Sequence, residues 1–483
     1  MMSIGISMEV RGSMKQFLKL TPEFVEYVES DGLTYEELEQ VLSDVGLDIG
    51  NVVCDPGRLL QNTYYADYEK GRYCEIYLQR AYMDTLSQVA RMSFKEPINR
   101  FLKNKDWETY YHLSVPVPML IFDFQRRYKE IEPEEVFEVW RSIHTRIDYS
   151  YDMWPSELLE YVFNHAPKPE LPELDEDGKI TVYRGMGALS QPTDKAISWS
   201  TSNINALWFA NRSARGTKLL RARVKPEDVV AYFSGFRYEN EVIIRPGADL
   251  EIFEEDMIPC TEDYVPKMLL PVMHEFLEFS KVALKLGYRR ESPFQQHGVK
   301  HILRVLLLTL IYFYNSGDNL SSEDKKILIY FSLLHDIGRT SDYVDENHGD
   351  NGLKLIHKKS LRIKNISMSK KAYRIANLII ANHCREDDIG IAAIKAEPTF
   401  SVQDKRRARK LYDIAKDMDG LDRVRFNGLD YLRLRTPYAR KLPLVAGGLL
   451  EEKLVDLISD PEFSIDDYIA KHDAQERERR NNM

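Results

Sequence analysis

The sequence predicts an α+β protein built from several domains. At 483 residues the chain is longer than one ordinary core requires, and length alone favours about two to four domains. Segments such as TYEELEQVLSDVG have helical apolar spacing, strand-like alternation begins at Ile180, and helical segments return after residue 262. We therefore expect a helical N-terminal region at 1–165, a mixed α/β domain at 166–262 and an all-α domain at 263–483.

The composition is typical of globular proteins, with 43% hydrophobic and 29% charged residues. A net charge of -10 argues against sequence-independent binding to nucleic acid, which depends on Lys and Arg. The four cysteines lack C-x-x-C spacing, which indicates a reducing compartment. The apolar run VLLLTLIYFY is too short to cross a bilayer, and the N-terminus shows no signal-peptide apolar core. We expect a cytoplasmic protein with no membrane partner.

Residues 1–165 show helical patterns but no recognisable chemistry. TPEFVEYVES and PEEVFEVWRSIHTRI have apolar residues at helical spacing. The tyrosine-rich stretch NTYYADYEKGRYCEIYLQRAY is expected to contribute to a core rather than to an interaction face. His112 and His144 have no partners at ligand spacing, so we expect both to be structural. The role of this region stays open between capping the next domain and binding a partner.

Polar residues mark the ends of the strand-like segments in the central domain. Each is common by itself, but together they suit a dinucleotide whose glycosidic bond breaks. An arginine offers a planar cation to pyrophosphate, hydroxyls can hold a ribose, and a carboxylate stabilises an oxocarbenium-like state. Two glutamates two residues apart are expected to face the same side of a strand. The residues are Arg184, the run Ser200, Thr201 and Ser202, and the pair Glu239 and Glu241.

The ordered set VYRGM, WSTS and FRYENEV resembles the Arg/Ser-Thr-Ser/Glu-x-Glu class of mono-ADP-ribosyltransferases, which use NAD as a substrate. The resemblance implies that Glu241 is the catalytic glutamate and that Glu239 prepares the acceptor. It also implies binding of the NAD phosphates by Arg184 and of the nicotinamide ribose by Ser200, beside Thr201 and Ser202. Phe236 matches the aromatic residue of the acceptor loop. This form is associated with arginine acceptors, but members also modify nucleic acid, so the acceptor stays open between protein and nucleic acid.

Histidines crowd the C-terminal domain. Six of the eleven histidines lie between His297 and His383. Neutral imidazoles and carboxylates form sites suited to divalent first-row metals. His297 and His301 would share one helix face, and His335 and Asp336 end the apolar run ILIYFSLL. Each histidine alone is more simply a core or surface residue, but their joint order favours a metal site.

The ordered blocks HGVKHILRV, LLHDIGR, NHGDNG, ANHCRED and DMDGLDRV resemble the HD superfamily of metal-dependent phosphohydrolases. The resemblance implies a divalent metal (Mn, Mg, Fe, Co or Ni) and a phosphate-containing small molecule as partner. The implied ligands are His301, His335, Asp336 and Asp419, with a second metal or a phosphate at His297, His348, His383 and Arg339. Asp417 and Asp422 flank Asp419, and the sequence leaves open which of these carboxylates is the ligand.

The function expected from both resemblances is NAD-dependent transfer of ADP-ribose to a macromolecular acceptor, coupled to a metal-dependent phosphohydrolase domain. Two alternatives stay open. In one, the protein is a nucleotide phosphohydrolase whose central domain is a regulatory NAD-binding module. In the other, both domains are non-enzymatic nucleotide sensors.

Overall fold

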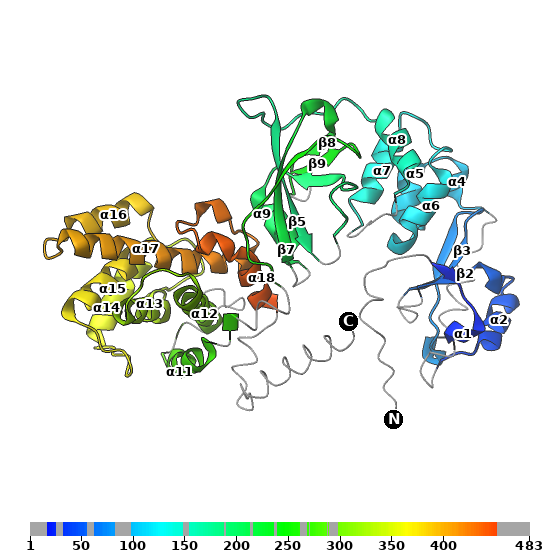
Figure 1. The fold of residues 1–483 in the computed structure, drawn as a ribbon. Helices are drawn as coiled ribbons and strands as arrows, with labels where there is room; N and C mark the ends of the chain where they lie inside the picture. The colour runs from blue at the N-terminus through cyan, green and yellow to red at the C-terminus, as the bar shows by residue number, and fades with distance from the viewer. Residues whose placement is uncertain are drawn as a thin grey trace, which may run out of the picture.

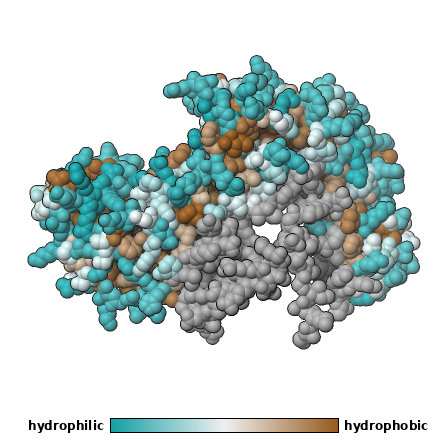
Figure 2. All heavy atoms as spheres, in the orientation of Figure 1, coloured by the Kyte–Doolittle hydropathy of each residue, from teal (hydrophilic) through white to brown (hydrophobic). Residues whose placement is uncertain are grey.

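The computed structural model combines helices with two antiparallel sheets, which confirms an α+β fold in general form (Figure 1). It describes residues 17–25, 32–55, 62–82, 98–147, 154–187, 190–212, 216–235, 239–260, 268–269, 271–286, 288 and 298–451. Across these ranges no helix combines the length and the apolar character that spanning a bilayer requires. Figure 2 shows a group of hydrophobic residues over the central sheet on the visible face.

The first described part is a small antiparallel sheet covered by a helix. Its strands are β1 (Leu18–Lys19), β2 (Val52–Cys54), β3 (Thr63–Asp67) and β4 (Arg72–Glu75), in that order across the sheet. The helices are α1 (Pro22–Val25), α2 (Tyr35–Asp44), η2 (Ile49–Asn51) and η3 (Arg80–Tyr82). A capping box starts α2, because Thr34 and Glu37 bond to each other's backbone N–H. Leu38 and Leu42 then pack against the sheet.

The N-terminal region, which the sequence predicts to be helical, thus also contains a four-stranded sheet. The tyrosine-rich stretch forms the hairpin of β3 and β4, where Tyr64, Tyr65 and Tyr73 are buried. Aromatic residues favour strands, and Gly71 supplies the positive φ of 61° that the connecting turn needs. The burial of these tyrosines agrees with the expected core role, although their secondary structure differs.

A helical layer follows and packs on the central sheet. Its elements are α4 (Arg100–Lys103), α5 (Trp107–Thr109), η4 (Tyr110–Ser114), η5 (Val117–Met119), α6 (Leu120–Arg127), α7 (Val136–His144) and α8 (Ser156–Asn164). In Figure 1, α7 and α8 lie beside β8 and β9. Trp140 of α7 and Phe163 of α8 share one hydrophobic cluster with Val230 and Ile243 of the sheet. The expected boundary at residue 165 thus does not separate two hydrophobic cores.

The central sheet has six antiparallel strands in the order β10-β7-β5-β6-β9-β8. The strands are β5 (Ile180–Gly187), β6 (Ser198–Ser200), β7 (Gly216–Val224), β8 (Val229–Phe233), β9 (Glu241–Ile244) and β10 (Glu251–Glu254), with helices α9 (Asn203–Asn211) and η7 (Pro226–Asp228). Helix α9 packs closely on β5. A Cβ at Gly185 would lie 1.9 Å from the carbonyl oxygen of Ala206, so glycine is required there.

The C-terminal part is helical. It contains α11 (Met273–Ala283), α12 (Val299–Asn315), α13 (Ser322–Leu334), α14 (His348–Lys358), α15 (Lys370–Asn382), α16 (Asp387–Ala396), α17 (Val402–Leu421), η8 (Asp422–Phe426), η9 (Tyr431–Arg433), η10 (Ala439–Lys441) and α18 (Pro443–Glu451). Apolar α12 and α13 lie at its centre, with Leu306 and Phe331 fully buried. All the described elements here are helices or connections.

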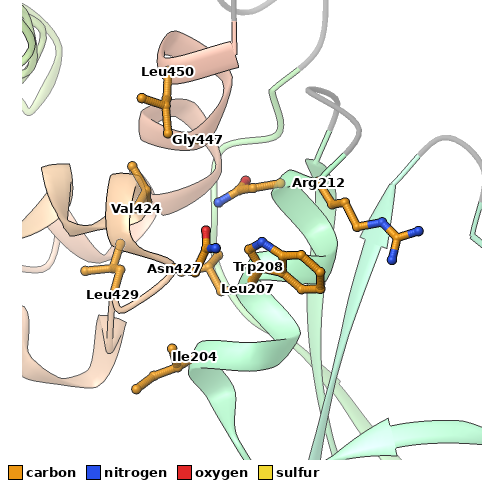
Figure 3. Close-up of a pocket in the computed structure, with 10 residues that line it drawn as sticks. Ile204, Leu207, Trp208, Arg212, Val424, Asn427, Leu429, Gly447 and Leu450 are labelled. Atoms are coloured by element: carbon orange, nitrogen blue, oxygen red, sulfur yellow. The ribbon is translucent and has the colours of Figure 1, made fainter. Parts of the chain in front are cut away.

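Helix α9 also packs on the C-terminal helices (Figure 3). Leu207 of α9 and Leu444 of α18 belong to one hydrophobic cluster. The side chain of Asn203 donates to Asp430 at 3.1 Å. Trp208 of α9 and Val424 of η8 line an open space of about 400 Å³ between the two parts. The central sheet and the C-terminal helices are therefore joined through α9.

Candidate functional sites

Three adjacent strands of the central sheet carry the residues singled out in the sequence. Arg184 lies on β5, Ser200 on β6 and Glu241 on β9. Ser200 is directly opposite Glu241, so their side chains share one face of the sheet. On the other side Ser200 pairs with Tyr183, so Arg184, one residue further along β5, starts from the opposite face of the sheet. The fold thus brings three separate sequence segments onto adjacent strands and places Ser200 and Glu241 on one face.

The carboxylate of Glu241 is buried and held by two other side chains. Ser198 donates its hydroxyl to Oε1 of Glu241 at 2.5 Å. The Nε2 atom of His144 lies 3.0 Å from the same oxygen. Glu241 is only 9% exposed, which makes such partners necessary for a charged group. Ser198 was missed, although it lies two residues before Ser200 on the same strand face and the period of two could have found it.

His144 was also missed, because it was expected to be structural. It ends α7, 97 residues before Glu241. Periodicity within a helix carries no information about a contact at that separation. The fold thus gives His144 a polar contact that its spacing in the sequence did not indicate.

Arg184 is poised to hold an anion. Its Nη1 donates to the carbonyl oxygen of Ser198 at 2.5 Å. Its Nε is buried, and no described residue accepts a hydrogen bond from it. Burial lowers the pKa of Arg184 to about 10, although the Glu241 carboxylate raises it, so the side chain is still a cation at neutral pH. A buried donor without an acceptor is costly, and a phosphate oxygen would satisfy it.

The two glutamates do not share a strand face, which corrects the sequence prediction. Strand β9 begins at Glu241, and Asn240 before it has a φ of 49°, in the left-handed region that asparagine tolerates. This residue breaks the alternation that the prediction assumed. Glu239 instead contributes its carbonyl oxygen, which accepts a hydrogen bond from the Ser200 hydroxyl at 2.6 Å.

The rest of the Ser-Thr-Ser run connects the sheet to α9. The N–H of Thr201 donates to the carbonyl of Asn240 at 3.0 Å. The N–H of Ser202 donates to Oγ of Ser200 at 3.0 Å, and the side chain of Ser202 caps α9. These bonds fix the turn that presents Ser200. Phe236 lies outside the described residues.

A second cluster gathers four histidines from the ends of four helices. Nε2 of His301 lies 3.1 Å from Nε2 of His335, and Nε2 of His348 lies 2.8 Å from Nε2 of His383. All four rings are at most 4% exposed. Facing ring nitrogens repel unless a proton or a cation lies between them, so this arrangement suits a cation.

The opposite ring nitrogen of each histidine is anchored. An anchored Nδ1 fixes the tautomer and turns Nε2 toward the centre, as is usual for histidines that bind metals. The partners of Nδ1 are the Asp422 carboxylate for His301 at 2.7 Å, and the carbonyl oxygens of Ser332 for His335 at 3.2 Å, Asp345 for His348 at 2.5 Å and Ile380 for His383 at 2.8 Å.

Asp336 lies between the two histidine pairs. Its Oδ2 is 3.5 Å from Nε2 of His301 and 3.9 Å from Nε2 of His335. Its Oδ1 is 3.1 Å from Nε2 of His348 and 3.7 Å from Nε2 of His383. One carboxylate thus presents a different oxygen to each pair, which is the geometry of a shared ligand.

The structure distinguishes the three aspartates that the sequence left open. Oδ1 of Asp419 lies 3.3 Å from Nε2 of His301, so Asp419 faces the centre. Asp422 instead anchors the far side of the His301 ring. Asp417 accepts backbone N–H bonds from Arg435 and Thr436, outside the cluster. The side chain of Asp419 is 31% exposed, whereas those of the four histidines and Asp336 are at most 2% exposed.

The charges of the cluster compensate one another. Burial lowers the pKa of His335 to about 3, so this ring is neutral and can offer a lone pair. Burial also opposes the charged form of His348, but the Asp336 carboxylate outweighs it and raises the pKa of His348 to about 10. Burial raises the pKa of Asp419, but His301 and His335 hold it below its usual range. The buried carboxylates therefore attract positive charge to this point.

Neighbouring residues complete the second cluster. Arg304 and Arg425 bond to Asp422, at 2.5 and 2.8 Å. Arg339 donates to Asp336 at 3.3 Å, so it lies beside the centre. Cys384, which the sequence did not single out, has its sulfur within 4.8 Å of ligand atoms of His348 and His383. His297 lies outside the described residues.

Comparisons of the chain with protein-family models, with curated proteins and with solved structures found no match. The proposals below therefore rest on the residues themselves.

Proposed function

We propose that this chain is an NAD-dependent mono-ADP-ribosyltransferase that modifies a macromolecular acceptor, a protein arginine being favoured over a nucleic acid. The observation that carries the proposal is the buried carboxylate of Glu241, held by Ser198 and His144 opposite Ser200. A buried, oriented carboxylate is what stabilisation of a positively charged sugar requires.

Each residue has a role in the proposed reaction. Arg184 binds the pyrophosphate of NAD with its unsatisfied Nε, and Ser200 borders the nicotinamide ribose. The bond between the ribose C1′ and nicotinamide breaks, and nicotinamide leaves with the bonding electrons. Glu241 stabilises the positive charge that develops on the sugar. The acceptor then bonds to C1′ and loses a proton, with which Glu239 assists.

The test is release of nicotinamide from labelled NAD, followed in parallel with labelling of cellular macromolecules. Glu241→Gln should abolish both, by on the order of 10²- to 10³-fold or more. Glu254→Gln, an exposed glutamate of β10 in the same sheet, is the matched control and should behave as wild type. Wild-type rates in the Glu241→Gln variant would rule out this role for the sheet.

A second function, metal-dependent phosphohydrolysis in the C-terminal helices, is supported by Asp336 and the two histidine pairs. His301, His335, Asp336 and Asp419 would hold one divalent metal ion, and His348 and His383 with Asp336 would hold another. The donor set fits, because imidazole and carboxylate suit Mn, Fe, Co and Ni, and oxygen ligands suit Mg. When bound, such a metal supplies Lewis-acid chemistry toward a phosphate compound.

The protein's own residues prepare this site. Asp422 orients His301 and is itself neutralised by Arg304 and Arg425, so a buried negative charge does not compete with the ligands. Arg339 lies beside Asp336, where a cationic side chain can hold a phosphate group. The partly exposed Asp419 marks the side from which the phosphate compound approaches.

Incubation with labelled NAD and with a panel of nucleotides, with and without Mn²⁺, separates the proposals. Nicotinamide release and macromolecular label support the transferase. Metal-dependent phosphate release alone supports a phosphohydrolase whose sheet is a regulatory module. The absence of both activities, with NAD or nucleotide still bound, supports a sensor.

A further inference from the structure

The contact between His144 and Glu241 extends the proposed transferase site to the helical layer. His144 ends α7, and its Nε2 lies 3.0 Å from Oε1 of Glu241. The hydroxyl of Ser198 donates to that same oxygen. Two donors on one oxygen restrict the rotation of the carboxylate far more than either one would.

The surroundings of His144 show that the ring is held for this contact. The imidazole stacks on Trp140, with centroids 4.8 Å apart and an angle of 17° between the rings. Trp140 is fully buried in the cluster that joins α7 and α8 to the sheet. The other ring nitrogen, Nδ1, is buried without a hydrogen-bond partner among the described residues. A structural histidine normally satisfies both nitrogens, so the bond to Glu241 is the polar contact that fixes this ring.

Resting on the proposed transferase function, we propose that His144 is a positioning residue for Glu241. As an N–H donor it fixes the orientation of the carboxylate that stabilises a cationic sugar. It does not contact the phosphates, a task assigned to Arg184. Its loss should therefore lower kcat while leaving the KM for NAD nearly unchanged.

The helical layer also contributes a side chain to the proposed transferase site. Helix α7 precedes the first strand of the central sheet, yet it supplies a side chain that reaches the reacting carboxylate. The proposed transferase therefore needs the helices of 98–164 for chemistry as well as for packing.

Two substitutions separate hydrogen bonding from packing. His144→Gln keeps an N–H donor near the position of Nε2 but removes the ring. His144→Phe keeps a ring that can stack on Trp140 but removes the donor. We expect the glutamine variant to retain most of kcat, and the phenylalanine variant to lose about 10- to 100-fold, the range for a hydrogen bond to a charged group. Thermal stability should show the opposite order. The phenylalanine variant, which keeps the stacked ring, should have a higher thermal midpoint than the glutamine variant.

The measurement is the steady-state rate of nicotinamide release at varied NAD, on the full chain. His165→Phe is the control, because His165 is the C-cap of α8 in the same layer and bonds to the carbonyl of Tyr161 rather than to Glu241. If the phenylalanine variant does not fold, His144→Leu serves as the variant without a donor.

The inference is overturned if the phenylalanine variant keeps wild-type kcat, or if the glutamine variant falls as far as the phenylalanine variant. A rise in KM without loss of kcat would also overturn it. Failure of the proposed function itself looks different. In that case the wild type releases no more nicotinamide than Glu241→Gln, and the role of His144 is refuted together with the transferase.

Discussion

Replacement of Asp336 by alanine should remove metal from the whole histidine cluster. Its two carboxylate oxygens face different histidine pairs, at 3.5 Å from Nε2 of His301 and 3.1 Å from Nε2 of His348. Each of the other proposed ligands belongs to one pair or faces one pair only. Asp336 is therefore the one position among the described ligands at which a single substitution is expected to weaken both sites.

The expected loss of metal affinity follows from the geometry. Loss of a group that merely orients a metal-binding histidine costs about 10- to 100-fold in affinity. Asp336 would bind directly and at two sites, so the loss at each should reach at least the upper end of that range. Protein dialysed against limiting Mn²⁺ should then hold about two ions per chain in the wild type and almost none in Asp336→Ala. His383→Ala should keep about one ion.

Elemental analysis of dialysed protein measures these contents, with circular dichroism to show that each variant is folded. His357→Ala is the matched control, since His357 lies on α14 with His348 but is exposed. The reasoning is refuted if Asp336→Ala retains as much metal as wild type. Retention of one ion would show that the carboxylate serves a single site.

Three further changes test other parts of the structure. Glu239→Gln should lose macromolecular labelling yet keep hydrolysis of NAD by water, measured as nicotinamide release. Equal loss of labelling and of nicotinamide release would contradict its role at the acceptor. Gly185→Ala should destabilise by about 3 kcal/mol, because the added carbon would lie 1.9 Å from the backbone oxygen of Ala206; an unchanged urea midpoint would contradict this. Burial raises the pKa of Asp387, but Arg435 lowers it to a net value of about 2. A lowered folded-state pKa stabilises above about pH 4 and is lost as the pH falls toward 2. Asp387→Asn should therefore lower the free energy of unfolding by roughly 1 kcal/mol at pH 7, after allowance for the 37% exposed side chain of Asp387. Near pH 2 the substitution should change this free energy very little, and thermal melts at the two pH values measure the difference.

The sequence predicted best where residues act through local spacing. His335 and Asp336 end an apolar helical run, and the structure places them at the buried end of α13. The strands that carry Arg184 and Glu241 were also expected, because alternation and β-branched residues mark them. Such patterns depend on residues within one helix or strand, so they can be recognised without knowledge of the fold.

Prediction failed where a single backbone angle or a distant contact decides the outcome. The left-handed conformation of Asn240 removes Glu239 from the strand, and no periodicity reveals it. The small N-terminal sheet was missed because tyrosines such as Tyr64 and Tyr73 suit a helix core or a strand equally in a short window. The bond between His144 and Glu241 joins segments 97 residues apart and becomes visible only in the fold.

The central and C-terminal parts, which the sequence predicts to be two domains, are connected through α9. Its N-cap, Ser202, is bonded to Ser200 at the proposed transferase site, and its first residue, Asn203, bonds to Asp430 in the C-terminal part. Asp430 lies eight residues after Asp422, the residue that orients His301. A ligand that moves the turn at Ser200 would therefore act on a helix packed against the segment that holds the histidine cluster. Because coupling free energies are reciprocal, any change that NAD makes in metal affinity must equal the change that the metal makes in NAD affinity.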